Sequence, residues 1–252
     1  MERAREFRQC LHLEGCDALP RVQGDPQFGP AGDLGTLPAL RGFTLTELLV
    51  GTAILLILAA LLLSAAGRAG RKVNAAGCLG NLREWGVATR LYAVNNEGFL
   101  PKDGSASGSS TDEGWYVDLP RAMGLPAYAE MRWRTNANVE PGRSVWICPS
   151  NPRRSNGKNL FHYCLNEHVN GLGAGNRINL SSIPRPACTV WLFDNGGAAP
   201  VAQQNNVHTN LHGQGAQFLF LDGHACRLPS RAYWDFAAHR GLTNNPELLW
   251  FP

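Results

Sequence analysis

An apolar stretch of 22 residues, Leu45 to Ala66, limits what this chain can fold into more than any other feature. Twelve of these residues are Leu, Ile or Val, and Glu47 is the only charged one. A helix of this length measures about 33 Å, and the hydrocarbon core of a bilayer is about 30 Å thick. The apolar side chains favour insertion by about 6 kcal/mol, whereas a charge costs about 3 kcal/mol at the helix centre and less near its end. The stretch therefore predicts a membrane-spanning helix that tolerates its glutamate.

A carboxylate inside a membrane helix marks a candidate functional site, because a buried charge needs a partner. The alternative is an ordinary signal anchor with Glu47 in the headgroup region. A lone anchor, however, has no evident use for a membrane carboxylate. The residues at the start of the stretch distinguish the two, and they read Gly42-Phe43-Thr44-Leu45-Thr46-Glu47-Leu48-Leu49-Val50. This segment resembles the processing site of type IV prepilins and type II secretion pseudopilins.

The resemblance implies a processing pathway. A prepilin peptidase would cut after Gly42, remove residues 1–42 as a leader peptide and methylate the new N-terminal residue, Phe43. Glu47 would meet the N-terminal amine of a neighbouring subunit during assembly. The implied partners are the peptidase, other pilin or pseudopilin subunits, an inner-membrane assembly platform and membrane lipid. The implied location is the inner membrane, crossed once, with a cytoplasmic N-terminus, a periplasmic C-terminal domain and a place in a filament.

The basic residues near the span point to the opposite orientation. The leader side offers only Arg41, whereas the far side offers Arg68, Arg71, Lys72 and Arg83. The positive-inside rule alone would place the C-terminal side in the cytoplasm. We give the processing motif more weight, since the peptidase of that family acts at the cytoplasmic face.

The helix is expected to continue beyond its transmembrane half, residues 43–66, through an outer half at residues 67–97. Apolar residues there recur at steps of three or four, which is typical of an amphipathic helix. They are Leu79, Leu82, Trp85, Ala88 and Tyr92. The Asn-Asn-Glu-Gly segment at 95–98, followed by Pro101, predicts the end of the helix.

Residues 98–252 are expected to form a globular α+β pseudopilin-like domain. Strands are predicted at 144–149, 160–166 and 189–193, and a hairpin at 216–228 around Asp222-Gly223, the pair that favours a type I′ turn. The predicted fold is therefore α+β. A long N-terminal transmembrane and amphipathic helix packs on a small antiparallel sheet, which together form a pilin-like lollipop.

A second motif lies near the C-terminus. His212 precedes Asp222-Gly223 by nine intervening residues, and His224 follows the turn. This spacing resembles the H-x9-DG motif of prepilin-type processing-associated proteins. With His208, these side chains are of types that suit zinc. The alternative is a hairpin whose Asp222 holds the turn, with His212 packed or hydrogen-bonded against it. We favour the hairpin and assign no metal and no cofactor.

Five of the seven cysteines follow the leader, and none of them forms a C-x-x-C pair. Cys148 and Cys164 flank a loop between two predicted strands, which makes a disulfide plausible if those strands are neighbours. Cys188 and Cys226 could form a second bridge, which would leave Cys78 free. Pairing of Cys164 or Cys226 with a histidine two residues away would place both on one face of a strand. The sequence has no nucleophile elbow or oxyanion hole to accompany such a pair.

These features together predict a structural subunit rather than an enzyme. The net charge of +3 is too small and too dispersed to indicate nucleic-acid binding. The expected function is that of a pseudopilin in a type II secretion or type IV pilus-like filament. The alternative is a signal-anchored periplasmic module that binds a metal or a glycan and does not polymerise.

Overall fold

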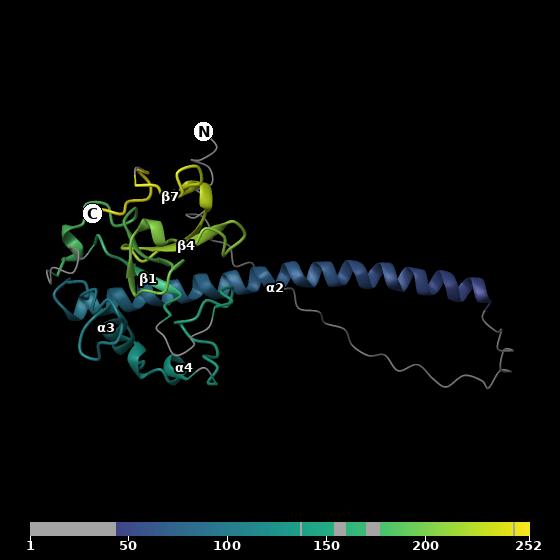
Figure 1. Ribbon diagram of the computed structural model, residues 1–252, viewed down its shortest axis with the longest axis horizontal. Coiled ribbons are helices and arrows are strands. Elements are labelled where there is room, and N and C mark those ends of the chain that lie inside the picture. The colour runs from purple at the N-terminus through teal and green to yellow at the C-terminus, as the bar shows by residue number, and fades with distance from the viewer. Residues whose placement is uncertain (1–43, 137, 154–159, 170–176, 244) are drawn as a thin grey trace, which may run out of the picture. The chain divides into compact units, whose positions relative to one another are not determined.

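The computed structural model describes residues 44–136, 138–153, 160–169, 177–243 and 245–252. The chain has an α+β fold with one long N-terminal helix and a mixed five-stranded sheet (Figure 1). The described residues fall into two units, and the division lies between Ala69 and Gly70 within the long helix. The second unit, residues 70–252, contains every strand of the described part of the chain.

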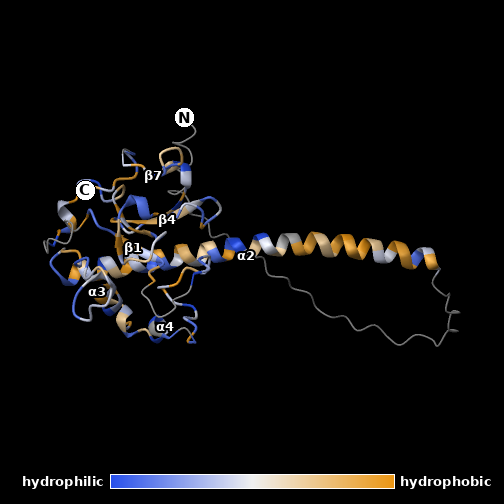
Figure 2. Cartoon of the chain, in the orientation of Figure 1, coloured by the Kyte–Doolittle hydropathy of each residue, from blue (hydrophilic) through white to orange (hydrophobic). Residues whose placement is uncertain are grey.

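The long helix, α2 (Leu45–Asn95), runs for 51 residues without a break. Figure 2 shows that its N-terminal part is strongly apolar. The helix ends where the backbone N–H of Gly98 donates to the Ala93 carbonyl at 2.8 Å. Gly98 has φ +84°, which glycine adopts without strain. The predicted continuation of the helix beyond residue 66 is therefore confirmed, and α2 ends at Asn95, two residues before the predicted end at residue 97.

One face of α2 in the second unit is completely buried. Leu82, Trp85 and Ala88 have no exposed surface, whereas Val87 on the other side of the helix is 65% exposed. The spacing of three and four residues identified this face correctly, because it places side chains on one stripe of a 3.6-residue helix. Gly86 allows the closest approach, since a Cβ atom there would lie 3.0 Å from both the Gly223 carbonyl oxygen and Leu219 Cδ1.

The sheet has the strand order β3-β1-β2-β4-β5. The strands are β1 (Tyr163–Asn166), β2 (Val190–Asp194), β3 (Val201–Ala202), β4 (Gly215–Phe220) and β5 (Ala225–Pro229). All pairs are antiparallel except β1 and β3, which are parallel. The prediction of an antiparallel sheet is wrong at this edge. Both edges of β2 are occupied, by β1 and by β4, so β3 pairs with the free edge of β1. Since the chain reverses between β1 and β2 and again between β2 and β3, β3 runs parallel to β1.

The sheet is buried on both faces, and two hydrophobic clusters cover it. Tyr163 and Leu165 of β1 contribute to the cluster that contains Trp85 of α2, while Cys164 contributes to the cluster that contains Trp250. This alternation follows the two-residue period of a strand. In the view of Figure 1 the sheet lies above the second half of α2, and α3 (Trp115–Ala122) and α4 (Arg132–Thr135) lie below it.

The segment 144–149 is not a strand, contrary to the prediction, and forms turns instead. The Asn81 side-chain amide on α2 donates to the carbonyls of Ser144 (3.3 Å) and Ile147 (2.9 Å). These two backbone carbonyls of the segment 144–149 therefore have their hydrogen-bond partner on the helix rather than on a neighbouring strand. A local sequence pattern cannot reveal these hydrogen bonds, because Asn81 lies more than 60 positions earlier in the chain.

The predicted hairpin is confirmed as β4 and β5, but its turn is not type I′. The Gly223 N–H donates to the Phe220 carbonyl at 2.9 Å, and Gly223 has φ +91°. Type I′ needs positive φ at Asp222 as well, and Asp222 is not among the described non-glycine residues with positive φ. The Phe220 N–H also donates to the His224 carbonyl at 2.9 Å, so these two residues are paired and the loop between them is the three residues 221–223. Its last residue, Gly223, has the left-handed conformation.

The remaining elements are short. They are η1 (Tyr128–Glu130), η2 (Leu180–Ser182), η3 (Gln204–Asn206), η4 (Ser230–Ala232), β6 (Trp234–Asp235) and β7 (Arg240–Gly241). β6 and β7 form a separate two-stranded antiparallel sheet.

Candidate functional site

The predicted processing residues, Gly42 and Phe43, lie outside the described residues. The first described residue is Thr44, which directly precedes α2, so the structure begins two residues after the predicted cut.

Glu47 takes part in a reciprocal set of hydrogen bonds with Thr44. The Thr44 backbone N–H and hydroxyl donate to Glu47 Oε2 at 2.9 and 2.7 Å, and the Glu47 N–H donates to Thr44 Oγ1 at 3.3 Å. This is a capping box, in which the residue before the helix and the third helical residue satisfy each other's backbone donors. The argument that a lone anchor has no use for this carboxylate is therefore wrong, since Glu47 helps to start the helix.

α2 is long and apolar enough to cross a membrane by length and composition. The most apolar 18 residues of α2 include no buried residue. The large hydrophobic side chains between Leu45 and Leu63 are 51% to 79% exposed. Such a continuous apolar surface is far larger than soluble proteins normally expose to water.

The two halves of the C-terminal motif do not meet. The His212 N–H donates to the Gly215 carbonyl at the start of β4, whereas Asp222 lies in the turn that follows β4. Six strand residues separate them, a distance of about 20 Å. The expectation that His212 packs against Asp222 is therefore wrong, and the two cannot bind one metal ion together.

Asp222 does hold the turn, as predicted. One of its oxygens accepts from the His224 backbone N–H at 3.0 Å and lies 2.6 Å from His224 Nδ1. Partial burial opposes ionisation of Asp222, but the two hydrogen bonds from His224 and the charges of His224 and Arg90 outweigh it, so the pKa of Asp222 is lowered. Gly223 leaves room for Arg90, whose Nε would lie 2.8 Å from a Cβ atom at Gly223.

His212 instead faces Asp194, the last residue of β2. His212 Nε2 lies 3.1 Å from Asp194 Oδ2, and both side chains are completely buried. The same Asp194 oxygen accepts from the Gln217 backbone N–H at 2.7 Å. Sequence reasoning missed Asp194 because Asp194-Asn195-Gly196-Gly197 after an apolar run is typical of a turn. One feature could have indicated its role. Asp194 is a carboxylate at the very end of β2, a strand that is buried on both faces.

The predicted cysteine pairing is also wrong. Cys78, in the second unit on α2, forms a disulfide with Cys148, and Cys164 and Cys188 are free thiols, so neither predicted bridge is formed. Cys164 points into the cluster on the other side of the sheet from Cys148, so the two cannot meet. A bond between a helix and a turn has no local sequence signature.

Both histidines considered from the sequence as partners of a cysteine nucleophile make other contacts. His162 Nδ1 accepts from the Cys148 backbone N–H at 3.0 Å, and His224 stacks on Phe220. Complete burial raises the pKa of the Cys164 thiol well above its usual value, and the charge of Asp194 acts in the same direction. Cys164 is therefore a poor nucleophile.

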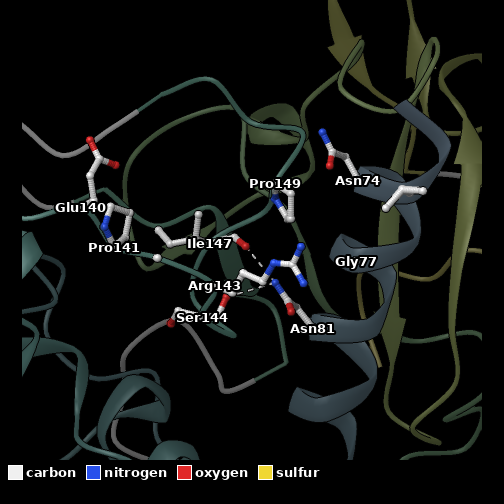
Figure 3. A pocket seen from close by; sticks show the side chains of 11 residues that line it. Asn74, Gly77, Asn81, Glu140, Pro141, Arg143, Ser144, Ile147 and Pro149 are labelled. Atoms are coloured by element: carbon white, nitrogen blue, oxygen red, sulfur yellow. Dashed lines mark hydrogen bonds between the residues drawn. The ribbon is translucent and has the colours of Figure 1, made fainter. Parts of the chain in front are cut away.

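A pocket of about 410 Å³ lies in the second unit between α2 and residues 140–149 (Figure 3). Asn74 and Asn81 line it from the helix, and Glu140 and Arg143 line it from the opposite segment. In Figure 3 the Arg143 side chain extends toward Asn81 across the pocket, while Glu140 lies at the far edge. The pocket therefore presents amide and charged groups on a partly apolar floor.

Comparisons with models of protein families, with curated proteins and with solved structures found no match.

Proposed function

We propose that this chain is a structural, pilin-like subunit of a type II secretion or type IV pilus-like filament, processed by a prepilin peptidase. One observation carries the proposal. The segment Gly42 to Val50 contains the start of an exposed apolar helix at Leu45, and that same helix continues without a break into the core of residues 70–252. The proposed shape is the pilin-like lollipop. A single helix that is membrane anchor at one end and domain core at the other is what a subunit drawn out of the membrane requires.

The proposed assembly uses the exposed half of α2. The apolar side chains remain in lipid until subunits associate, and helix–helix contacts then replace the lipid contacts. The amine of a neighbour's processed Phe43 would meet the Glu47 carboxylate. Glu47 is exposed, so a neighbour can reach it although Thr44 already donates to one oxygen. Ion pairing would offset the cost of burying both charges.

The Cys78–Cys148 disulfide supports a periplasmic location for residues 70–252. Disulfides persist in oxidising compartments and are rare in the cytoplasm. This favours the orientation that the processing motif implies, with the N-terminus in the cytoplasm, over the one that the basic residues near the span imply.

A second candidate is a signal-anchored periplasmic binding module that does not polymerise. Two observations favour it. The capping box gives Glu47 a purpose within one chain, and the pocket between α2 and residues 140–149 offers polar groups to a small ligand such as a glycan.

Mass spectrometry of protein made in a host with the peptidase tests the processing step. The expected N-terminus is methylated Phe43. Gly42→Leu should leave the leader attached, because a bulky residue blocks the cut, whereas Gly51→Leu within the span should be processed normally. Recovery of an intact leader on the unaltered chain, or a cut elsewhere, would overturn the assignment. Co-purification with an inner-membrane assembly platform would then separate the filament subunit from the anchored module.

A further inference from the structure

Three potential metal ligands converge in one buried place, and a fourth lies beside one of them. The Cys78 and Cys148 sulfurs and one ring nitrogen of His212 all lie within 4.8 Å of one another. Asp194 Oδ2 adjoins the same histidine nitrogen at 3.1 Å. They come from α2, from the turn segment before β1, from the loop before β4 and from the end of β2, so only the folded chain brings them together.

The distances to His212 match those around a tetrahedral metal. Bond lengths of about 2.3 Å for zinc–sulfur and about 2.0–2.1 Å for zinc–nitrogen and zinc–oxygen place a nitrogen about 3.6 Å from a sulfur and about 3.3 Å from an oxygen. His212 Nε2 lies 3.6 Å from Cys148 Sγ and 3.1 Å from Asp194 Oδ2. The two bonded sulfurs are closer than a metal would hold them, and Asp194 does not belong to the group of atoms within 4.8 Å of one another. Opening the disulfide frees the sulfurs to separate and to move toward Asp194.

The potential ligands are buried, and two of their side chains have polar atoms without hydrogen-bond partners. Cys78, Cys148 and Asp194 are completely buried, as is the His212 side chain. Asp194 Oδ1 and His212 Nδ1 have no hydrogen-bond partner among the described residues. Buried polar atoms without protein partners are uncommon in folded proteins, and each of these two lies on the same side chain as an atom assigned to the site.

We propose that the reduced form of this chain binds one zinc ion through Cys78, Cys148, His212 and Asp194. A Cys₂-His-Asp set offers the sulfur, nitrogen and carboxylate ligands that zinc takes in closed, four-coordinate sites. The disulfide and the metal exclude each other, since the sulfurs cannot bond to each other and bind zinc as thiolates. The inference concerns the folded domain only and does not depend on filament assembly.

The chemistry balances with a phosphine as the reductant. The phosphine and one water convert the disulfide into two thiols and become a phosphine oxide. The two thiols then lose two protons as zinc binds, and His212 Nε2 supplies its lone pair while the ring proton resides on Nδ1. Air or a disulfide oxidant reverses the process, takes two electrons from the thiolates and releases the ion. Zinc binding is therefore expected to weaken as pH falls, because protons compete for the thiolates.

The first test titrates the full chain in detergent with Co²⁺, a spectroscopic substitute for zinc, after anaerobic reduction with a phosphine. The expected result is one equivalent bound, with the intense visible absorption of tetrahedral cobalt and a thiolate-to-cobalt charge-transfer band, both abolished by Zn²⁺. The disulfide form should bind at least a hundredfold more weakly. Absence of tetrahedral absorption in the reduced chain overturns the proposal.

Variants identify the ligands. His212→Gln and Asp194→Asn should each weaken binding at least tenfold, while Cys164→Ser, which removes a buried thiol outside the cluster, should leave it unchanged. Binding that persists in His212→Gln, or that needs Cys164, contradicts the assigned ligands.

A third measurement needs no substitution and covers the case in which variants fail to fold. With one equivalent of Zn²⁺, Cys78 and Cys148 of the reduced chain should resist alkylation while the partly exposed Cys188 reacts. The near-ultraviolet circular dichroism of the buried tryptophans should be native with zinc bound. Alkylation of Cys78 and Cys148 at the rate of Cys188, or a chain that stays unfolded with zinc, overturns the proposal.

Discussion

The indole N–H of Trp191 donates to the hydroxyl of Thr89 across 2.8 Å, and this hydrogen bond joins the centre of the sheet to α2. Both side chains are buried, and the Thr89 hydroxyl in turn donates to the Trp85 carbonyl at 2.8 Å. Thr89→Val should therefore lower the free energy of unfolding by about 1–3 kcal/mol, because it leaves the Trp191 N–H unsatisfied without changing the shape of the site much. Thr89→Ser keeps the hydroxyl and should cost less. Chemical denaturation followed by tryptophan fluorescence makes the comparison, and equal stability of the valine variant and the unaltered chain would show that the bond contributes nothing.

Two helical glycines are expected to respond to alanine with opposite signs. Gly80→Ala should stabilise the chain by up to about 1 kcal/mol, since alanine favours helix and a Cβ atom there meets nothing within 4 Å. Gly86→Ala should destabilise it by about 1–3 kcal/mol, because its Cβ atom would press on the Gly223 carbonyl and on buried Leu219. Thermal unfolding of the two variants gives the signs. Stabilisation by both would mean that α2 and the hairpin can move apart at no cost.

Removal of the disulfide should be costly. The bond closes a sequence separation of 70 residues, for which the chain-entropy relation gives about 4 kcal/mol of stability through the unfolded state. Cys78→Ser should lose most of this, whereas Cys188→Ser, which removes a free thiol, should be nearly neutral. Urea denaturation gives the magnitudes, and peptide mapping without reductant should find a Cys78–Cys148 peptide. A Cys148–Cys164 peptide would refute the pairing.

Charge and capping at Glu47 can be separated by two substitutions. Glu47→Gln keeps the hydrogen-bonding geometry of a capping box but removes the charge, and Glu47→Leu removes both. In the filament proposal both variants should insert and be cut after Gly42, yet enter cross-linked oligomers poorly, because a neighbour's amine loses its counter-charge at about 3–5 kcal/mol. In the anchored-module alternative Glu47→Gln should behave like the unaltered chain in every assay. Cross-linking of sheared and membrane fractions reads out the difference.

His208 should make stability depend on pH. Burial lowers its pKa below the usual 6.5, helped by the charges of Arg153 and His212 and opposed by Asp194. Its Nδ1 also accepts from the Asn210 N–H at 3.2 Å, which protonation there would prevent. The unfolded chain therefore binds this proton more readily than the folded chain, and stability falls as pH drops below about 6.5.

The variant His208→Asn should lose less stability between pH 7.5 and 5.5 than the unaltered chain. His239→Asn, at an exposed position, serves as the control for removing a histidine. Parallel pH profiles for the His208 variant and the unaltered chain would contradict this role.

Local patterns were enough to predict α2 and the β4–β5 hairpin. The steps of three and four from Leu82 to Ala88 reflect one face of a helix, and the Asp222-Gly223 pair marks a chain reversal, so each prediction needs only neighbouring residues. Even there, the turn type was predicted wrongly, and the packing of Gly223 against Arg90, a residue more than a hundred positions earlier in the chain, could not be predicted from the pair.

Apart from the capping box of Glu47, the main errors involve partners that are distant in sequence. Whether residues 144–149 form a strand depends on whether Asn81 takes their carbonyls, and the pairing of Cys148 depends on which side of the sheet Cys164 faces. His212 was assigned to Asp222 because the two share a motif, but its actual partner, Asp194, ends a different strand. Spacing along the chain does not reveal which buried carboxylate a histidine will meet.

The position of the disulfide determines how α2 would bear mechanical load. Among the residues of α2 whose side chains are described, Cys78 is the first from the N-terminal end to be completely buried. A pull applied along the helix from its apolar end therefore reaches a covalent bond before it reaches the packing of Leu82, Trp85 and Ala88. The helix cannot be peeled from the sheet turn by turn from that end, because the force is diverted through sulfur into the segment before β1. With the disulfide formed, more force would therefore be needed to pull α2 out of the domain than the free energy of unfolding alone predicts.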